Sequence, residues 1–178
     1  CGYTPAFPAW LHFESFASLH GLSLISPNDT KTVRYRQPGI MNHIQRLKRW
    51  QRQRFFRYGG RDSDATHLFT SKSCLIFSQS SGSWQSLQKM AQFPVGIAPL
   101  PMDKNISQTR HANTFGGGAV WVVQQNNRKK IDGIRAWLTY LAKPEVQWQW
   151  YKNTGYLPMM DVEHVAQQSK LLKIATQD

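Results

Sequence analysis

Acidic residues are scarce in this sequence: its 178 residues include 10 Asp and Glu against 22 Lys and Arg, for a formal net charge of +12. Such an excess of positive charge favours an anionic partner, such as a nucleic acid, an acidic surface or a phosphorylated small molecule. The charge alone does not select among these. Long hydrophobic runs are also lacking, and none approaches the roughly 20 residues of a membrane-spanning helix.

Cysteine is almost absent, with Cys1 and Cys74 as the two examples. Their number is compatible with one disulfide in an oxidising compartment and equally with two buried thiols. The first residue is Cys rather than Met, so we interpret the chain as a processed chain or a piece of a larger protein. Aromatic residues make up 12% of the chain, and this content argues against disorder.

Patterns typical of enzymes are missing. The six histidines are scattered, and no pair has the i,i+4 spacing of a helical zinc site. No G-x-S-x-G motif is present. The carboxylates Asp62 and Asp64 lie in a polar stretch that is typical of a solvated loop. We therefore expect no catalytic residues, no metal site and no cofactor.

Apolar spacing and turn residues predict short strands that alternate with helices, which is typical of an α/β fold. The expected helices span residues 9–20, 40–56, 84–90, 131–141 and 144–155. The expected strands span residues 73–78, 93–101 and 119–124. The glycine pair Gly59-Gly60 should end the second helix, and Gly155 should end the last one.

Two segments have the composition of anion sites. Ser80-Ser81-Gly82-Ser83 lies between a strand and a helix, where backbone N–H groups and hydroxyls can bind phosphate or carboxylate. Simple capping of the helix by serine is the alternative. The glycine run 116–118 allows the backbone to approach a ligand, or it forms a strained entry into a strand.

A basic segment begins at Arg46 and ends at Arg61, with aromatic residues between its cations. This pattern suits a surface that stacks single-stranded bases. The alternative is a solvated helix face whose long side chains cover apolar surface. Helical spacing groups Trp50 with Ile44 and Leu47 toward the core, which favours the solvated face. We therefore expect no nucleic-acid partner.

Several motifs together resemble those of one family, in the same order and at similar spacing. They are Cys1-Gly2-Tyr3, residues 7–16, Ser80-Ser81-Gly82-Ser83, residues 113–122, Leu141-Ala142-Lys143-Pro144-Glu145 and Lys152-Asn153-Thr154-Gly155-Tyr156-Leu157-Pro158. The chain resembles the extracellular solute-binding proteins of bacterial ABC importers, in particular members that bind glycerol phosphates. The last two motifs, at this separation, are the more specific ones.

The resemblance implies an α/β lobe of the type II periplasmic-binding-protein fold, with residues 1–178 covering mostly the C-terminal lobe and the second lobe largely missing. It further implies a monomer in the periplasm that binds sn-glycerol-3-phosphate or a glycerophosphodiester and delivers it to permease subunits. The alternatives are a sugar-binding member of the same transporter family and a nucleic-acid-binding module that uses the basic segment from Arg46 to Arg61. Such an incomplete lobe should fold poorly alone.

The resemblance also implies a set of ligand residues. Phe7 and Trp10 match two tryptophans that pack on the glycerol part, and Phe7 departs from the family because it has no indole N–H. Ser80 matches a serine that binds the ligand, and Gly117 matches a glycine whose backbone approaches it. Tyr156 matches a tyrosine that hydrogen-bonds the phosphate end.

Overall fold

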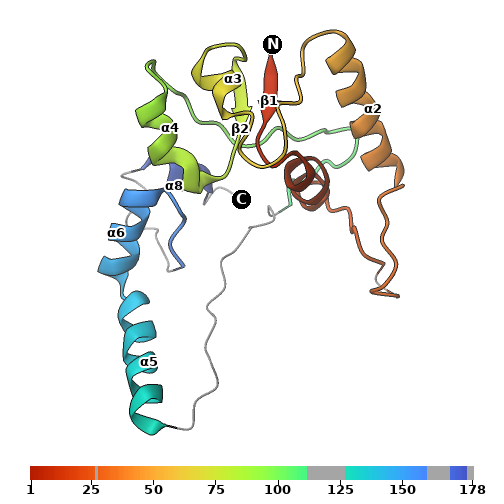
Figure 1. The fold of residues 1–178 in the computed structure, drawn as a ribbon. Helices are drawn as coiled ribbons and strands as arrows, with labels where there is room; N and C mark the ends of the chain where they lie inside the picture. Colours follow the sequence, from red (N-terminus) through yellow and green to blue (C-terminus); the bar gives the residue numbers. More distant parts are fainter. Residues whose placement is uncertain (27, 112–126, 160–168, 176–178) are drawn as a thin grey trace.

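The computed structural model describes residues 1–26, 28–111, 127–159 and 169–175. Strand β1 (Tyr3–Pro5) pairs in parallel with β2 (Ile76–Ser78), with Tyr3 opposite Ile76 and Pro5 opposite Ser78. A parallel bridge from Tyr3 to Phe56 adds a third segment at the other edge of β1. Helices lie on both sides of this small sheet (Figure 1). The expected α/β arrangement is confirmed in this part of the chain.

Two of the strand predictions have clear outcomes. The strand expected at 73–78 is confirmed, although it is shorter and less buried, with Ile76 exposed. The strand expected at 93–101 is wrong, because these residues form no regular element. Pro94, Pro99 and Pro101 provide no N–H for a ladder, which explains the failure. The strand expected at 119–124 lies outside the described residues.

The first helical segment follows β1 directly. Residues Trp10–Ser15 adopt π-helical geometry (η1) and continue as α1 (Phe16–Leu19). Gly21 then takes a left-handed φ of 67°, a conformation that glycine adopts without steric cost. The helix predicted at 9–20 is thus confirmed, although its π-helical first half was not foreseen.

Helix α2 (Pro38–Arg52) ends earlier than the sequence predicts. Its buried residues are Ile40, His43 and Leu47. The apolar spacing predicts the burial of Ile40 and Leu47 but not that of His43, and Ile44 and Trp50, expected on the same face, are half-buried. The chain then reverses at Arg54, whose φ is 62°, so that Phe56 can pair with Tyr3. The prediction that Gly59 and Gly60 end this helix is therefore wrong: a long-range strand pairing ends it.

Later helices agree well with the apolar spacing. The further helical elements are α3 (Thr66–Thr70), the 3₁₀ turn η2 (Ser81–Ser83), α4 (Trp84–Met90), α5 (Arg128–Leu141), α6 (Pro144–Thr154) and α8 (Lys170–Ala175). Gly155, at a φ of 86°, ends α6 as expected. The sequence did not predict α3 and α8. No helix within the described ranges is long and apolar enough to cross a membrane.

A disulfide between Cys1 and Cys74 joins the residues that precede β1 and β2, with their Cα atoms 4.4 Å apart. Cys74 is buried with Ala65 and Leu68, and Cys1 packs against this cluster. The pairing decides between the two alternatives that the cysteine count leaves open. It also links the amino ends of the paired strands across 73 residues of sequence.

Breaking this disulfide should destabilise the fold. In the chain-entropy account, a closed loop of this length contributes about 4 kcal/mol by restricting the unfolded chain. We expect Cys1→Ala with Cys74→Ala to lower the free energy of unfolding by a substantial part of that amount, as measured by urea denaturation. Dithiothreitol should destabilise the unmodified chain similarly and leave the double variant unaffected. Equal stability of the two proteins without reductant would contradict the prediction.

Two buried histidines meet between η1 and α2. The Nδ1 atom of His12 lies 3.1 Å from the Nε2 atom of His43, and the ring of His43 stacks on Phe16. Burial lowers the pKa of His12 to about 4. The pKa of His43 is lowered to about 3, mostly by burial and further by repulsion from His12, once it is protonated, and from Arg46. Both imidazoles are therefore neutral in the fold at pH 7.

Acid should weaken the fold through this pair. Below pH 6.5 the unfolded chain takes up protons that the folded histidines exclude, so stability is lost as the pH falls from about 6.5 toward 4. Each imidazole contributes about 1.4 kcal/mol per pH unit in that window. His43→Gln should make the pH slope of the unfolding free energy clearly shallower, whereas Gln45→Ala, which changes an exposed residue of the same helix that does not titrate, should not. Identical slopes for all three proteins would refute the assignment.

Candidate functional site

The paired strands β1 and β2 end side by side, and we call this carboxyl end of the sheet the ligand edge. Pro5 ends β1 opposite Ser78 of β2, and the backbone N–H of Ala6 donates to the carbonyl of Ser78 at 2.9 Å. The third segment is bridged through Phe56 to Tyr3, the first residue of β1, and continues from there in the same direction. Ligands of open α/β sheets bind beyond the carboxyl ends of the strands. The ligand edge is therefore the candidate site, and Phe7 and Ser80 lie just after the strands that end there.

Phe7 forms a tight connection between β1 and the helix that carries Trp10. Its φ of 44° is left-handed, and its carbonyl accepts from the N–H of Leu11 at 3.0 Å. Both aromatic side chains are half-buried. The two aromatic residues expected at the site thus lie one helical turn apart at the end of β1.

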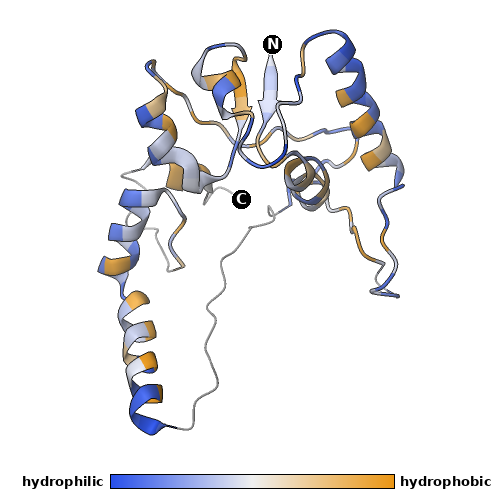
Figure 2. Cartoon of the chain, viewed as in Figure 1, coloured by the Kyte–Doolittle hydropathy of each residue, from blue (hydrophilic) through white to orange (hydrophobic). Residues whose placement is uncertain are grey.

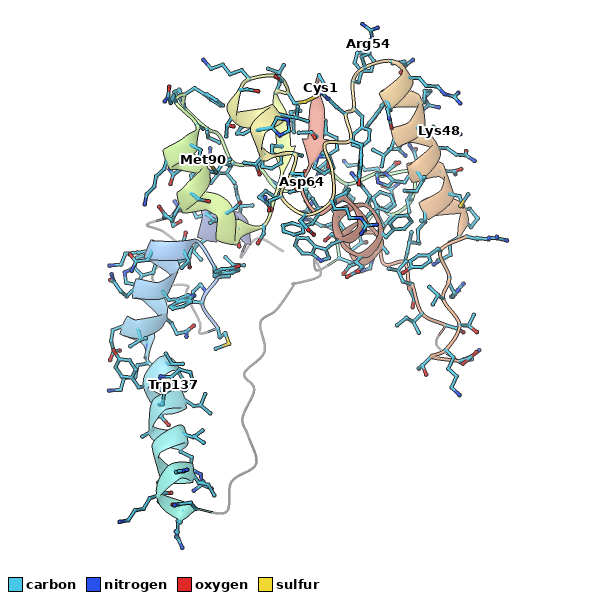
Figure 3. The ribbon with its side chains drawn as sticks, viewed as in Figure 1. Cys1, Lys48, Arg54, Asp64, Met90 and Trp137 are labelled. Carbon is cyan, nitrogen blue, oxygen red and sulfur yellow. A yellow bond between two sulfur atoms is a disulfide. The ribbon has the colours of Figure 1, made fainter. Side chains whose placement is uncertain are left out.

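A loop that the sequence did not assign to the site adjoins Phe7. The N–H of Phe7 donates to the carbonyl of Asp62 at 2.7 Å, and the Asp64 carboxylate accepts from the N–H of Arg61 at 3.1 Å. In Figure 3, Asp64 lies near the carboxyl end of the strands and the first helix. Gly60, whose φ of 122° suits glycine, marks the turn that starts this loop. No feature of the neighbouring sequence indicates that the loop contacts Phe7.

Ser80 lies at the start of the η2 turn after β2. Its hydroxyl oxygen accepts from the N–H of Gly82 at 3.3 Å, and its carbonyl accepts from the hydroxyl of Ser83 at 2.7 Å. Capping by serine, one alternative from the sequence, is therefore present. Among the described residues the Ser80 hydroxyl finds no acceptor of its own, so its proton is available to a ligand.

Two glycines bring Tyr156 to the same turn. Gly82 packs so closely against the Tyr156 ring that an added Cβ would lie 2.5 Å from its Cε1 and Cζ atoms. A Cβ on Gly155 would collide with the carbonyl oxygen of Ser81. The Tyr156 side chain remains 52% exposed, so it is accessible from solvent beside the turn that starts at Ser80.

Four of the five expected site residues thus lie in two pairs beyond the ligand edge: Phe7 and Trp10 follow β1, and Ser80 follows β2 with Tyr156 packed on its turn. Gly117 lies outside the described residues. The arrangement combines aromatic faces with hydroxyl donors, which suits a small polar ligand with an apolar side. No three His, Cys, Asp or Glu side chains of the described ranges gather as a metal site.

Comparison with known proteins identifies the family of this chain. Residues 3–171 match the family described as bacterial extracellular solute-binding protein. The chain belongs to this family. That membership confirms the expected α/β lobe of a solute-binding protein.

Individual relatives of this extracellular solute-binding protein carry a more specific name. The sn-glycerol-3-phosphate-binding periplasmic proteins UgpB of Yersinia pestis and Salmonella typhimurium are each 30% identical to it over 164 residues. UgpB of Escherichia coli K12 is 29% identical over the same length. Each match covers 89% of this chain and 37% of the relative. The chain thus spans little more than a third of these curated relatives.

Replacing Gly155 should disturb the contact between Tyr156 and the Ser80 turn in this solute-binding protein. Gly155→Ala adds a Cβ at a left-handed φ and against Ser81, so we expect a loss of about 1–3 kcal/mol in the free energy of unfolding. Gly133→Ala is the matched control. Gly133 lies within α5, and an added Cβ there meets nothing within 4 Å. It should stabilise the helix by about 0.5–1 kcal/mol.

Urea denaturation followed by circular dichroism measures both variants. Near-ultraviolet dichroism should change for Gly155→Ala, because Tyr156 moves, and stay the same for Gly133→Ala. A Gly155→Ala protein as stable as the unmodified chain would contradict the packing described for Gly155.

Proposed function

We propose that this chain forms part of the substrate-binding protein of an ABC importer in the periplasm. In this proposal it binds sn-glycerol-3-phosphate or a glycerophosphodiester, delivers it to the permease subunits, acts as a monomer and catalyses no reaction. The observation that carries the proposal is that Phe7 and Trp10 follow β1, while Ser80, with Tyr156 packed on its turn, follows the paired strand β2. The names of the relatives at about 30% identity support the ligand class.

Each side chain then has a physical role. The Ser80 hydroxyl and the Tyr156 phenol donate hydrogen bonds to the phosphate, and such bonds to a charged group are stronger than neutral ones. Phe7 and Trp10 pack on the glycerol carbons. The backbone of Gly117 approaches the ligand, as the family resemblance implies. The loop around Asp62 holds Phe7 in place through its backbone hydrogen bond.

We propose further that residues 1–178 are mostly the C-terminal lobe of a two-lobed protein. Helix α5 supports this, because none of its residues is buried and both Trp137 and Tyr140 are 54% exposed. A helix with such large apolar side chains normally packs against other parts of a fold. The missing lobe and the final helices would supply the further ligand contacts and the surface that covers α5.

Titration calorimetry tests the ligand with the full-length protein that contains this chain and with two single variants of it. Ser80→Ala and Tyr156→Phe each remove one donor to a charged group, which is worth about 1.5–3 kcal/mol. Each should therefore weaken sn-glycerol-3-phosphate binding about 10- to 150-fold. Trp10→Ala should weaken glycerol-3-phosphate and glycerophosphocholine to the same extent, because it removes apolar contact with the part they share.

Two control variants show whether a loss of affinity comes from the lost ligand contact or from the loss of any nearby or exposed hydroxyl. Ser83→Ala removes a hydroxyl that already donates to Ser80, and Tyr140→Phe removes the phenol oxygen of a tyrosine as exposed as Tyr156. Both should leave the affinity nearly unchanged. Unchanged affinity in Ser80→Ala and Tyr156→Phe would exclude the assigned anion site. Heat with maltose but none with either glycerol phosphate would assign the sugar alternative.

A further inference from the structure

The candidate ligand site uses only the end of the basic segment, where Arg61 belongs to the loop beside Phe7. Between Lys31 and Arg61 the sequence contains ten cations and no carboxylate. Helix α2 presents Ile40, His43 and Leu47 to the core. The exposed cations of this helix and of the segment after it form what we call the basic surface: Lys48, Arg49, Arg52, Arg54 and Arg57.

This basic surface is held rigidly and has no internal counter-charge. The carbonyl of Phe55 accepts from the N–H groups of Gly2 and Tyr3 at 2.9 and 2.8 Å, and the N–H of Arg57 donates to Tyr3 at 3.0 Å. Within the part of the chain that the structure describes, none of its five cations forms an ion pair. Arg46, by contrast, is paired with Asp103. The positive charge of the basic surface is therefore available to a partner.

Exposed aromatic side chains accompany these cations. Phe55 is 61% exposed and Tyr58 is 51% exposed, and both alternate in sequence with basic residues. Trp50, the best base-stacking side chain of the segment, is instead half-buried on the inner side of α2. Phe55 has no polar group that could form a hydrogen bond with the edge of a nucleic-acid base. An apolar ring among arginines suits the boundary between lipid headgroups and acyl chains.

The position of the basic surface agrees with a membrane contact. In Figure 3, Arg54 lies near Cys1, at the end of the sheet where β1 starts, and Lys48 points outward from α2, whereas Asp64 lies toward the opposite end. Figure 2 shows hydrophilic residues along the outer side of α2. A planar partner on the basic surface would leave the edge with Ser80 and Phe7 open to ligand.

We propose that the basic surface docks on an anionic phospholipid membrane, with Phe55 inserted at headgroup depth. The choice of a membrane as the polyanion rests on the proposed importer function, because the permease that receives the ligand is itself embedded in a bilayer. The match between the positive charge of the basic surface and an anionic partner does not depend on the importer function. Each Lys or Arg near an anionic bilayer strengthens binding roughly fivefold. Salt screens such contacts.

Vesicle co-sedimentation tests the proposal with the unmodified protein. We expect binding to vesicles of phosphatidylcholine and phosphatidylglycerol at 50 mM salt, much weaker binding at 500 mM, and none to pure phosphatidylcholine. Arg49→Gln with Arg52→Gln should weaken binding about 25-fold, and Phe55→Ser should weaken it several-fold. The control Arg128→Gln with Lys129→Gln removes the same charge from exposed positions on α5 and should have a clearly smaller effect.

Circular dichroism and glycerol-3-phosphate calorimetry accompany each variant, so a loss of vesicle binding is separated from a loss of fold or of ligand binding. Absence of binding to the anionic vesicles overturns the proposal, and so does an equal loss in the α5 control. A single-stranded oligonucleotide, matched in phosphate concentration, provides the decisive competitor. If it binds more tightly than the vesicles and Arg49→Gln with Arg52→Gln abolishes that binding, the basic surface belongs to a nucleic acid instead.

Discussion

The parallel pairing of β1 with β2 is the constraint on which the rest of this structure depends. Two strands of three residues each have few hydrogen bonds, and such a sheet is marginal without further support. The disulfide between Cys1 and Cys74 provides it at the amino ends, together with the buried cluster of Ala65 and Leu68. With these ends held, the opposite ends of the strands are forced together, and that is where the candidate ligand residues follow.

The second half of the candidate site depends on glycine rather than on strands. Ser80 and Tyr156 are far apart in sequence, and no residue between them predicts their proximity. They meet because Gly82 and Gly155 lack side chains and allow the Ser80 turn, the end of α6 and the Tyr156 ring to come into contact. The adjacent pair Gly155-Tyr156 therefore provides both the end of α6 and the position of the Tyr156 ring.

Local patterns predicted local structure well and failed where distant residues compete. Helix α4 starts at Trp84 after the serine-rich turn, and α6 ends at Gly155, whose left-handed φ stops the helix. Both ends are set by residues next to them in sequence, and both predictions were confirmed. The predicted end of α2 was wrong because Phe56 pairs with Tyr3. The spacing of apolar residues around Phe56 does not reveal this distant partner. The loop at Asp62 was missed for the same reason, since its contact with Phe7 joins segments that are not neighbours in sequence.

The same pairing of Phe56 links the two surfaces of the molecule. Ending α2 at Arg52 exposes Phe55 and directs Arg54 and Arg57 away from the core, which completes the basic surface. It also starts the loop that reaches Phe7 at the ligand edge. A change that weakens the bridge between Tyr3 and Phe56 should therefore affect both surfaces, whereas changes to exposed cations act on one alone. The proposed membrane contact and the proposed ligand site are thus separable by mutation although one strand pairing supports both.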